Sequence, residues 1–209
     1  VYYAGTEAQW GELSGEGGGI SSGNGALTGA AVHCSDSGST DTPDTPQEGS
    51  LLQIDENLQV ASGKELKVLE GIDIRVFSGK TVKISGSVSA AGKLQNEGTL
   101  IIEGQLQAAG GIESSGRLAL SAGEITSSSA RGTVCGESGK LQLSGGTVTN
   151  TGEGPALSLT GSAPAGWNIS CVIRSKAANP VTLNGVPFLP DGYRVEQAAD
   201  GFYYLREGA

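Results

Sequence analysis

The sequence GKTVKISGSV (79–88) returns three times in altered form, as GTLIIEGQL (98–106), GRLALSAGEI (116–125) and GKLQLSGGTV (139–148). Each copy has a glycine, two apolar residues separated by one other residue, a second glycine and a third apolar residue. Apolar residues at period two mark one face of a β-strand, and glycine suits the bend where the strand closes. The stretch therefore predicts a series of short strands of the same design.

Looser copies flank these four, with Leu66 and Val68 before them and Leu157, Leu159, Val181 and Leu183 after them. The steps between the first apolar residues are 16, 18, 18, 23, 16 and 24 residues, so a unit holds about nineteen residues. One such strand cannot bury its apolar row, but coils stacked about 4.8 Å apart bury it against the next row. We therefore expect an all-β fold, a right-handed single-stranded parallel β-helix of six or seven coils. An antiparallel β-sandwich with glycine-rich turns is the alternative.

Composition supports a thin fold and a longer parent protein. The 209 residues include 35 glycines but only 5% aromatic residues, which suits a narrow solenoid better than a thick core. The chain has no methionine, so we expect a piece of a longer or processed protein. No apolar run approaches the length of a membrane span and no signal peptide is visible, so we expect no membrane span in this fragment.

Charge and cysteine content exclude several classes of function. The net charge is −9, and residues 1–63 contain nine carboxylates without a Lys or Arg. Nucleic acid is therefore not an expected partner, because an acidic chain has no field to neutralise phosphates. Cys34, Cys135 and Cys171 show no paired metal-ligand spacing, and the repeat places the last two in coils two apart, too far for a disulfide. We expect free thiols buried as small apolar residues.

Residues 1–34 differ in pattern from the repeats. Val1–Gly5 predicts a strand and turn, Ala8–Leu13 a short helix after the N-cap Thr6, and Ala26–Cys34 a second strand, which together make a small β-α-β appendage. The segments VYYAGTEAQW (1–10) and GNGALTGAAVH (23–33) resemble the terminal unit of BspA-like leucine-rich-repeat surface proteins of bacteria. The matching residues are Tyr3, Gly5, Thr6, Gln9, Trp10, Asn24, Leu27, Ala30 and His33.

That resemblance implies that 1–34 is a leucine-rich-repeat cap fragment, that more repeats preceded it, and that the parent is extracellular or on the cell surface. Residues 35–50, SDSGSTDTPDTPQEGS, have the composition of an acidic linker. Residues 51–209 would then form the β-helix, which resembles the β-helix modules of secreted proteins and adhesins. Aromatic residues return after Leu159, and Val186–Leu205 predicts a hairpin that caps the last coil.

Candidate chemistry is sparse. Gly19–Gly23 spells the GxSxG string of a serine nucleophile, but the strand before it and the helix after it are missing. β-Helix enzymes that cleave polysaccharides resemble this scaffold, yet in the repeat Glu103 aligns with serines, Glu124 aligns with Gln105 and Thr147, and no two acids share a column. Asp36, Asp41 and Asp44 lack the spacing of a calcium loop. We expect no catalytic residues, no metal site and no cofactor.

One surface feature suggests binding. Basic residues are expected at outward positions of adjacent coils, in a stripe that suits an anionic polysaccharide: Lys64, Lys67, Lys80, Lys83, Arg117 and Lys140. The alternative interpretation is a solvated face whose lysines pair with Glu65, Glu70 and Glu103.

The sequence thus favours a noncatalytic extracellular structural or adhesion module of a bacterial surface protein. Its partner would be a polysaccharide or a surface protein of host or bacterium. A carbohydrate-binding module and a polysaccharide lyase or hydrolase are the two alternatives.

Overall fold

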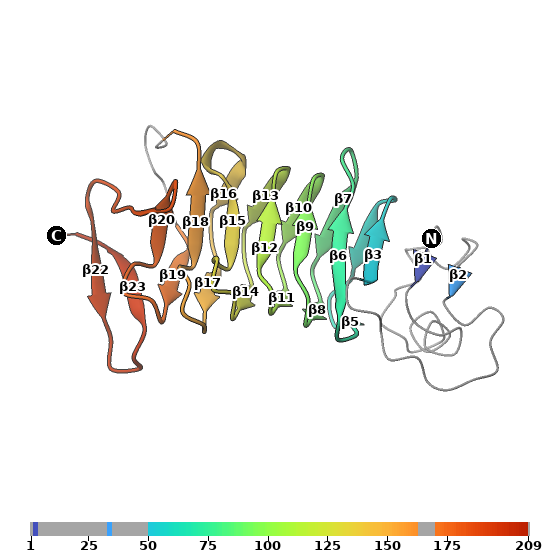
Figure 1. The fold of residues 1–209 in the computed structure, drawn as a ribbon, viewed down its shortest axis with the longest axis horizontal. Coiled ribbons are helices and arrows are strands. Elements are labelled where there is room, and N and C mark those ends of the chain that lie inside the picture. The colour runs from blue at the N-terminus through green and yellow to red at the C-terminus, as the bar shows by residue number, and fades with distance from the viewer. Residues whose placement is uncertain (1, 4–32, 35–49, 163–169, 209) are drawn as a thin grey trace.

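The computed structural model describes residues 2–3, 33–34, 50–162 and 170–208. From Ser50 onward the chain folds into stacked coils of β-strands (Figure 1). Successive coils pass through three sheets in turn, and all neighbouring strands pair in parallel except those at the C-terminal end. The result is a parallel β-solenoid of about six turns. The antiparallel sandwich is therefore excluded, because its strands would pair in the opposite direction.

The three sheets run along the length of the solenoid. Sheet 1 contains β3 (Ser50–Ile54), β6 (Ile72–Val76), β9 (Leu94–Asn96), β12 (Ile112–Ser114), β15 (Val134–Glu137), β18 (Leu157–Thr160), β20 (Val181–Leu183) and β21 (Val186–Pro187). Sheet 2 contains β4 (Leu58–Val60), β7 (Thr81–Ile84), β10 (Thr99–Ile102), β13 (Arg117–Leu120) and β16 (Leu141–Leu143). Sheet 3 contains β5 (Glu65–Val68), β8 (Ser87–Ala90), β11 (Gln105–Ala108), β14 (Glu124–Ser127), β17 (Thr147–Asn150), β19 (Val172–Ser175), β23 (Tyr203–Glu207) and β22 (Tyr193–Gln197).

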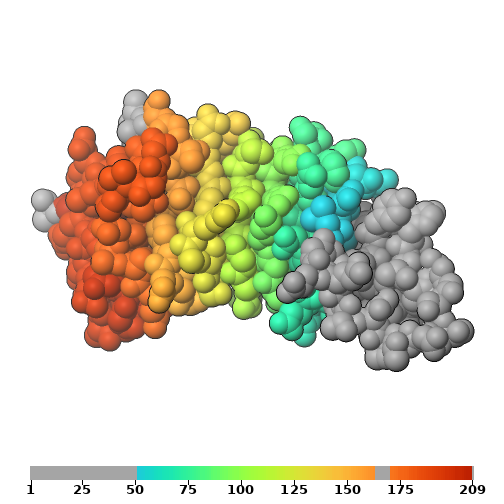
Figure 2. Space-filling model, in the orientation of Figure 1, coloured from blue at the N-terminus to red at the C-terminus, as the bar shows by residue number. Residues whose placement is uncertain are grey.

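The core is a set of apolar ladders that run along the axis. On sheet 3 one ladder is unbroken through eight strands: Leu66, Val88, Leu106, Ile125, Val148, Ile173, Leu205 and Val195. Sheets 1 and 2 contribute equivalent ladders, and most of their members are fully buried. Each fully buried aliphatic side chain stabilises the fold by about 1.5–3 kcal/mol. Each coil therefore depends on its neighbours, and the coils appear as successive bands along the body (Figure 2).

The four quoted repeats stack as their sequences predict. Val82 pairs with Leu100, Leu100 with Leu118, and Leu118 with Leu141 on sheet 2. The third apolar residue of each copy is a member of the sheet 3 ladder. A copy therefore spans one corner and two sheets.

The predicted alignment of the flanking copies with the four repeats is wrong. Leu66 stacks on Val88 of sheet 3, and the residue that stacks on Val82 is Leu58. Leu157 lies on sheet 1, where it pairs with Val134 and not with Leu141. All three sheets carry the same period-two pattern, so the pattern alone identifies an inward face but not which of the three faces it is.

The corners depend on glycine. Gly86, Gly104 and Gly123 follow one another at the corner between sheets 2 and 3, each against the backbone of the coil before it. A Cβ atom on Gly104 would collide with the carbonyl oxygen of Gly86. The repeated glycine is thus required by the close approach of one coil to the next.

The N-terminal strands β1 (Tyr2–Tyr3) and β2 (His33–Cys34) pair in parallel as a separate sheet. The helix expected between them, the linker at 35–49 and the GxSxG string lie outside the described residues. Within the described ranges the one helical segment is a 3-10 turn, η1 (Ser138–Lys140).

The C-terminal hairpin extends sheet 3. Strand β23 pairs antiparallel with β19, and β22 pairs antiparallel with β23. The hairpin expected over Val186–Leu205 is formed instead by β22 and β23, over Tyr193–Glu207, while Val186 belongs to β21 of sheet 1. Leu205 is buried, whereas Val195 is 37% exposed and Leu189 is 52% exposed.

Candidate functional surfaces

The basic residues expected to form one stripe lie on two different sheets. Lys67 points outward from β5 of sheet 3, with Lys64 in the turn before it. Lys83 points outward from β7 of sheet 2, with Lys80 just before that strand. Arg117 shares a column with Thr99 and Thr81 rather than with Lys80. The single stripe was therefore a wrong expectation, because it rested on placing Leu66 in the ladder of sheet 2.

Three of the six basic side chains have partners on the protein. Lys83 Nζ lies 2.9 Å from Glu103 Oε1. Arg117 donates to the side-chain amide oxygen of Gln142 at 2.7 Å. Lys140 Nζ contacts the carboxylate of Glu137 at 2.9 Å and donates to the backbone carbonyl of Ser115 at 2.9 Å.

The other three, Lys64, Lys67 and Lys80, make no side-chain ion pair or hydrogen bond to any described residue. They lie in the first two coils, at the N-terminal end of the solenoid. Within the described part of the chain, these three are the members of the predicted set whose charge has no partner.

Most of the outward ion pairs join neighbouring coils. Arg75 contacts Glu97 at 2.7 Å, from β6 to the coil that follows. On sheet 3, Arg174 reaches past Thr149 to the carboxylate of Glu124 at 3.5 Å, and its Nε donates to the hydroxyl of Thr149 at 3.0 Å. These pairs run parallel to the axis, so they fasten coils together rather than converge on a ligand.

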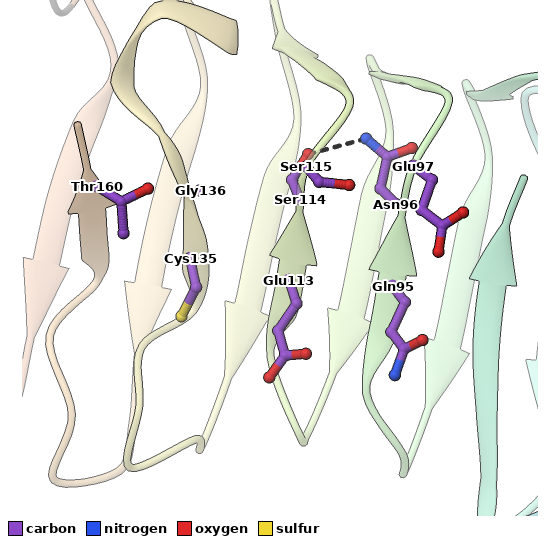
Figure 3. Close-up of a pocket in the computed structure, with 9 residues that line it drawn as sticks. All are labelled: Gln95, Asn96, Glu97, Glu113, Ser114, Ser115, Cys135, Gly136 and Thr160. Carbon is purple, nitrogen blue, oxygen red and sulfur yellow. Dashed lines mark hydrogen bonds between the residues drawn. The ribbon is translucent and has the colours of Figure 1, made fainter. Parts of the chain in front are cut away.

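A shallow groove of about 420 Å³ lies on the outer face of sheet 1 (Figure 3). Its lining residues come from β9, β12, β15, β18 and the corners after β9 and β12: Gln95, Asn96, Glu97, Glu113, Ser114, Ser115, Cys135, Gly136 and Thr160. Gln95, Glu113 and Cys135 occupy one outward column on successive strands. The groove thus runs across neighbouring strands of sheet 1 and includes the corner that follows them.

Both carboxylates in this groove are neutralised by basic residues at its edge. Glu97 is held by Arg75 through two nitrogen atoms at 2.9 and 2.7 Å. Glu113 contacts Arg131 at 3.2 Å and Lys93 at 3.7 Å. Neither carboxylate is a free charge, so the groove offers a cation no unpaired carboxylate.

Asn96 lies beneath the groove with no exposed surface. Its amide nitrogen donates to the hydroxyl of Ser114 at 2.9 Å and to the carbonyl of Arg117 at 3.0 Å (Figure 3). Its Oδ1 atom has no hydrogen-bond partner among the described residues.

The two described thiols, Cys135 and Cys171, form no disulfide, and both have a raised pKa. Cys135 and Cys171 are unpaired, as expected, although both are half-buried rather than buried. They lie in consecutive coils on different sheets, not two coils apart. Burial, together with the charge of Glu113, raises the pKa of Cys135, and burial raises the pKa of Cys171 to about 12. A thiol held protonated is a poor nucleophile. The side chain of Cys34 lies outside the described residues.

The carboxylates that the structure describes offer no arrangement for acid–base chemistry. The pKa of Glu103 is lowered by hydrogen bonds from Lys83 and Ser85, and this is the opposite of what a general acid needs. The predicted alignment of Glu124 with Gln105 and Thr147 is confirmed. The expectation that no two acids share a column is wrong, because Glu65 stands in the column of Glu124. They are three coils apart, about 14 Å, too far for the carboxyl pair of a glycosidase.

Sequence reasoning missed the groove entirely. Most of its residues belong to short strands of sheet 1, and in β9 and β12 one of the two inward positions is polar. The spacing of Leu94 and Asn96 from Ile112 and Ser114, eighteen residues in each case, was the available signal.

Neither a metal site nor a membrane-spanning helix is found in the described part of the chain. No three His, Cys, Asp or Glu side chains gather closely enough there to hold a metal ion. Among the same residues no helix has the length and hydropathy to cross a bilayer.

The fold and its surfaces define this chain as a parallel β-solenoid. Comparison with protein-family models, with curated proteins and with solved structures finds no match in any of the three.

Proposed function

We propose that this chain is a noncatalytic structural or adhesion module of a bacterial cell-surface protein, in which the solenoid acts as a stiff spacer. The observation that carries the proposal is the sheet 3 ladder, which continues from Leu66 to Val195 without a polar member. Because no coil can bury its apolar row alone, the stack resists local opening. The extracellular setting is supported by the resemblance of residues 1–34 to the cap of bacterial surface proteins.

The outward side chains support a mechanical role over a chemical one. Their ion pairs tie coils together along the axis, as Arg75 and Glu97 do. The thiols are held protonated and the carboxylates of the groove are neutralised, so neither supplies a nucleophile or an acid. These facts favour the spacer over a polysaccharide-cleaving enzyme.

Limited proteolysis and a polysaccharide screen test this proposal together. We expect thermolysin to leave a resistant core that begins near Ser50, because backbone bonded into stacked coils does not enter a protease site. Soluble neutral and anionic polysaccharides should release no reducing or unsaturated ends when incubated with the chain. Release of such ends, abolished by Glu97→Gln or Glu113→Gln, would refute the proposal in favour of an enzyme. Rapid cleavage within the solenoid would refute the stiff spacer.

An anionic polysaccharide is the second candidate, and the observation that favours it is that Lys64, Lys67 and Lys80 have no partner among the described residues. Charges that are not paired there are available to a polyanion, and such binding weakens as salt rises. We expect any binding to be lost when these three lysines are changed together to Gln. The matched control changes Lys83, Arg117 and Lys140, which already have partners, and should retain binding. Equal loss in both variants would indicate a general charge effect and contradict a site.

A further inference from the structure

The open edge of sheet 3 lies at the C-terminal end of the solenoid. Strand β22 pairs with β23 on one side, and Figure 1 shows no strand beyond it. Its five residues contain no proline and no bulge, and four of them are exposed. The edge of sheet 1 differs, because β21 has two residues and one is Pro187. Proteins commonly shorten or block an exposed edge in that way, and β22 has neither protection.

The hydrogen bonds of the hairpin show which backbone groups of β22 point outward. The N–H of Gly208 donates to the carbonyl of Gly192, and the N–H of Ala198 donates to the carbonyl of Phe202. In an antiparallel pair these bonds involve alternate residues. The even-numbered positions of β22 therefore bond to β23, and the N–H and C=O of Val195 point to the open side.

We propose that β22 pairs antiparallel with β22 of a second copy of this chain, about a two-fold axis at Val195. In this register each Val195 exchanges both backbone hydrogen bonds with Val195 of the second copy. Arg194 then lies opposite Glu196 of the second copy, and Glu196 lies opposite Arg194. Such an interface uses the same surface on both copies and closes as a dimer.

Charge complementarity selects this partner. Within the hairpin Arg194 stands directly opposite Arg206, so like charges face each other across β22 and β23, and the contact of Arg194 with Glu196 of its own strand is long, at 3.6 Å. The second copy brings a glutamate to the other side of Arg194. The Arg194–Glu196 pairs fall at the non-hydrogen-bonded positions of the new ladder, where Cα atoms are about 4.5 Å apart and side chains are closest.

The apolar ladder supports the same arrangement. Val195 is the last member of the sheet 3 ladder, and it is 37% exposed because no described strand pairs with β22 on its far side. In the dimer it meets Val195 of the second copy, and the ladder continues into the second solenoid. The two rods then join end to end through one continuous sheet.

Charge reversal tests the proposal in solution by sedimentation velocity at micromolar to about 1 mM protein, the range expected for so small an interface. The wild-type chain should dimerise, whereas Arg194→Glu and Glu196→Arg should each be monomeric. An equimolar mixture of the two variants should dimerise, because both cross-strand pairs are then attractive. The double variant R194E/E196R should also dimerise. Both side chains are 55% exposed, so circular dichroism should show each variant folded.

Two results would overturn the proposal. One is a wild-type chain that forms no dimer at about 1 mM, whether it stays monomeric, forms open polymers or binds only other proteins. The other is a single reversal that dimerises as well as the wild type.

A disulfide trap tests the register independently. In a chain with its three natural cysteines changed to Ser, Val195→Cys should form a covalent dimer on oxidation, because Cα atoms of a hydrogen-bonded pair lie about 5.5 Å apart. Gln197→Cys, four residues from its copy in this register, should not. The reverse result would refute the axis at Val195.

Discussion

Asn96 and Asn150 are both fully buried at the end of a strand, but only Asn150 satisfies both ends of its amide. The nitrogen of Asn150 donates to the carbonyls of Ser129 and Pro155, each at 2.8 Å, and its oxygen accepts from the N–H of Gly152 at 2.8 Å. Asn96 makes two bonds through its nitrogen and leaves its oxygen without a described partner.

We expect Asn150→Ala to destabilise the chain more than Asn96→Ala. The first change leaves the Ser129 carbonyl and the Gly152 N–H without this partner and removes one of the two bonds to the Pro155 carbonyl, which also accepts from the Thr133 N–H. Each group left without a partner costs about 1 kcal/mol or more. Asn96→Ala removes a side-chain oxygen that accepts no hydrogen bond from a described residue, so we expect its loss in the free energy of unfolding to be smaller by at least about 1 kcal/mol. Urea unfolding measures both free energies. Equal losses would contradict the accounting of the two amides.

Gly104→Ala should be one of the most damaging single-methyl changes in the solenoid. The new Cβ would meet backbone atoms of Gly86 and Ser85 in the preceding coil, which cannot move without opening the stack. We expect a loss of about 3 kcal/mol in the free energy of unfolding. Gly139→Ala is the matched control, because no atom lies within 4 Å of its Cβ position, and it should change stability by less than about 0.5 kcal/mol. A tolerated Gly104→Ala would show that the coils are spaced more widely.

The carboxyl of Glu103 should titrate below the ordinary range of a glutamate. Lys83 and Ser85 both donate to it and lower its pKa, so the folded state favours the ionised form. The stabilisation is present above the unfolded pKa and is lost as the pH falls through the folded pKa. Lys83→Met should move the NMR titration midpoint of Glu103 upward. An unchanged midpoint would show that the ion pair does not persist in solution.

Cys171 should reduce stability in alkali. Its pKa is raised by burial to about 12, whereas an unfolded cysteine ionises near about 8.5. The contribution is therefore complete below about pH 8.5 and declines as the pH rises toward the folded value. We expect Cys171→Val to lose less stability than the wild type between pH 8 and pH 10. An identical pH dependence would mean that the thiol is solvated in the fold.

Thiol labelling gives a second measurement of that site. In a Cys34→Ser chain, a disulfide reagent at pH 8 should modify Cys135 and Cys171 slowly until denaturant is added, because the protonated thiol does not attack. Rapid labelling of the folded chain would contradict the burial of both thiols.

The fold was predictable to the extent that one pattern repeats with its glycines in place. Leu100 and Leu118 stack as their sequences indicated because glycine corners allow the coils to approach closely. The error over Leu66 has a physical cause. Strands on each of the three sheets alternate inward and outward residues alike, and corner lengths vary, so counting residues does not identify the sheet.

The candidate surfaces were less predictable than the fold. Neutralisation of Glu97 by Arg75 needs the coil-to-coil pairing of β6 with β9, and the sequence separates these residues by 22 positions. That Lys64, Lys67 and Lys80 have no ion-pair partner among the described residues is likewise visible only once their neighbours are placed. Side-chain partners depend on which sheet faces which, and that is a property of the wound chain.

The sequence by itself determined that this chain winds, because period-two apolar rows and recurrent glycines leave a short strand no way to bury its face except against another coil. The tertiary structure decided where the winding places its polar groups and where it stops. Asn96 is buried and Glu97 is partly exposed because strand β9 ends at Asn96, and β22 has an open side because no described strand pairs with it there. Local pattern sets which side of a strand is buried, whereas only the assembled stack sets what that side and its edge meet.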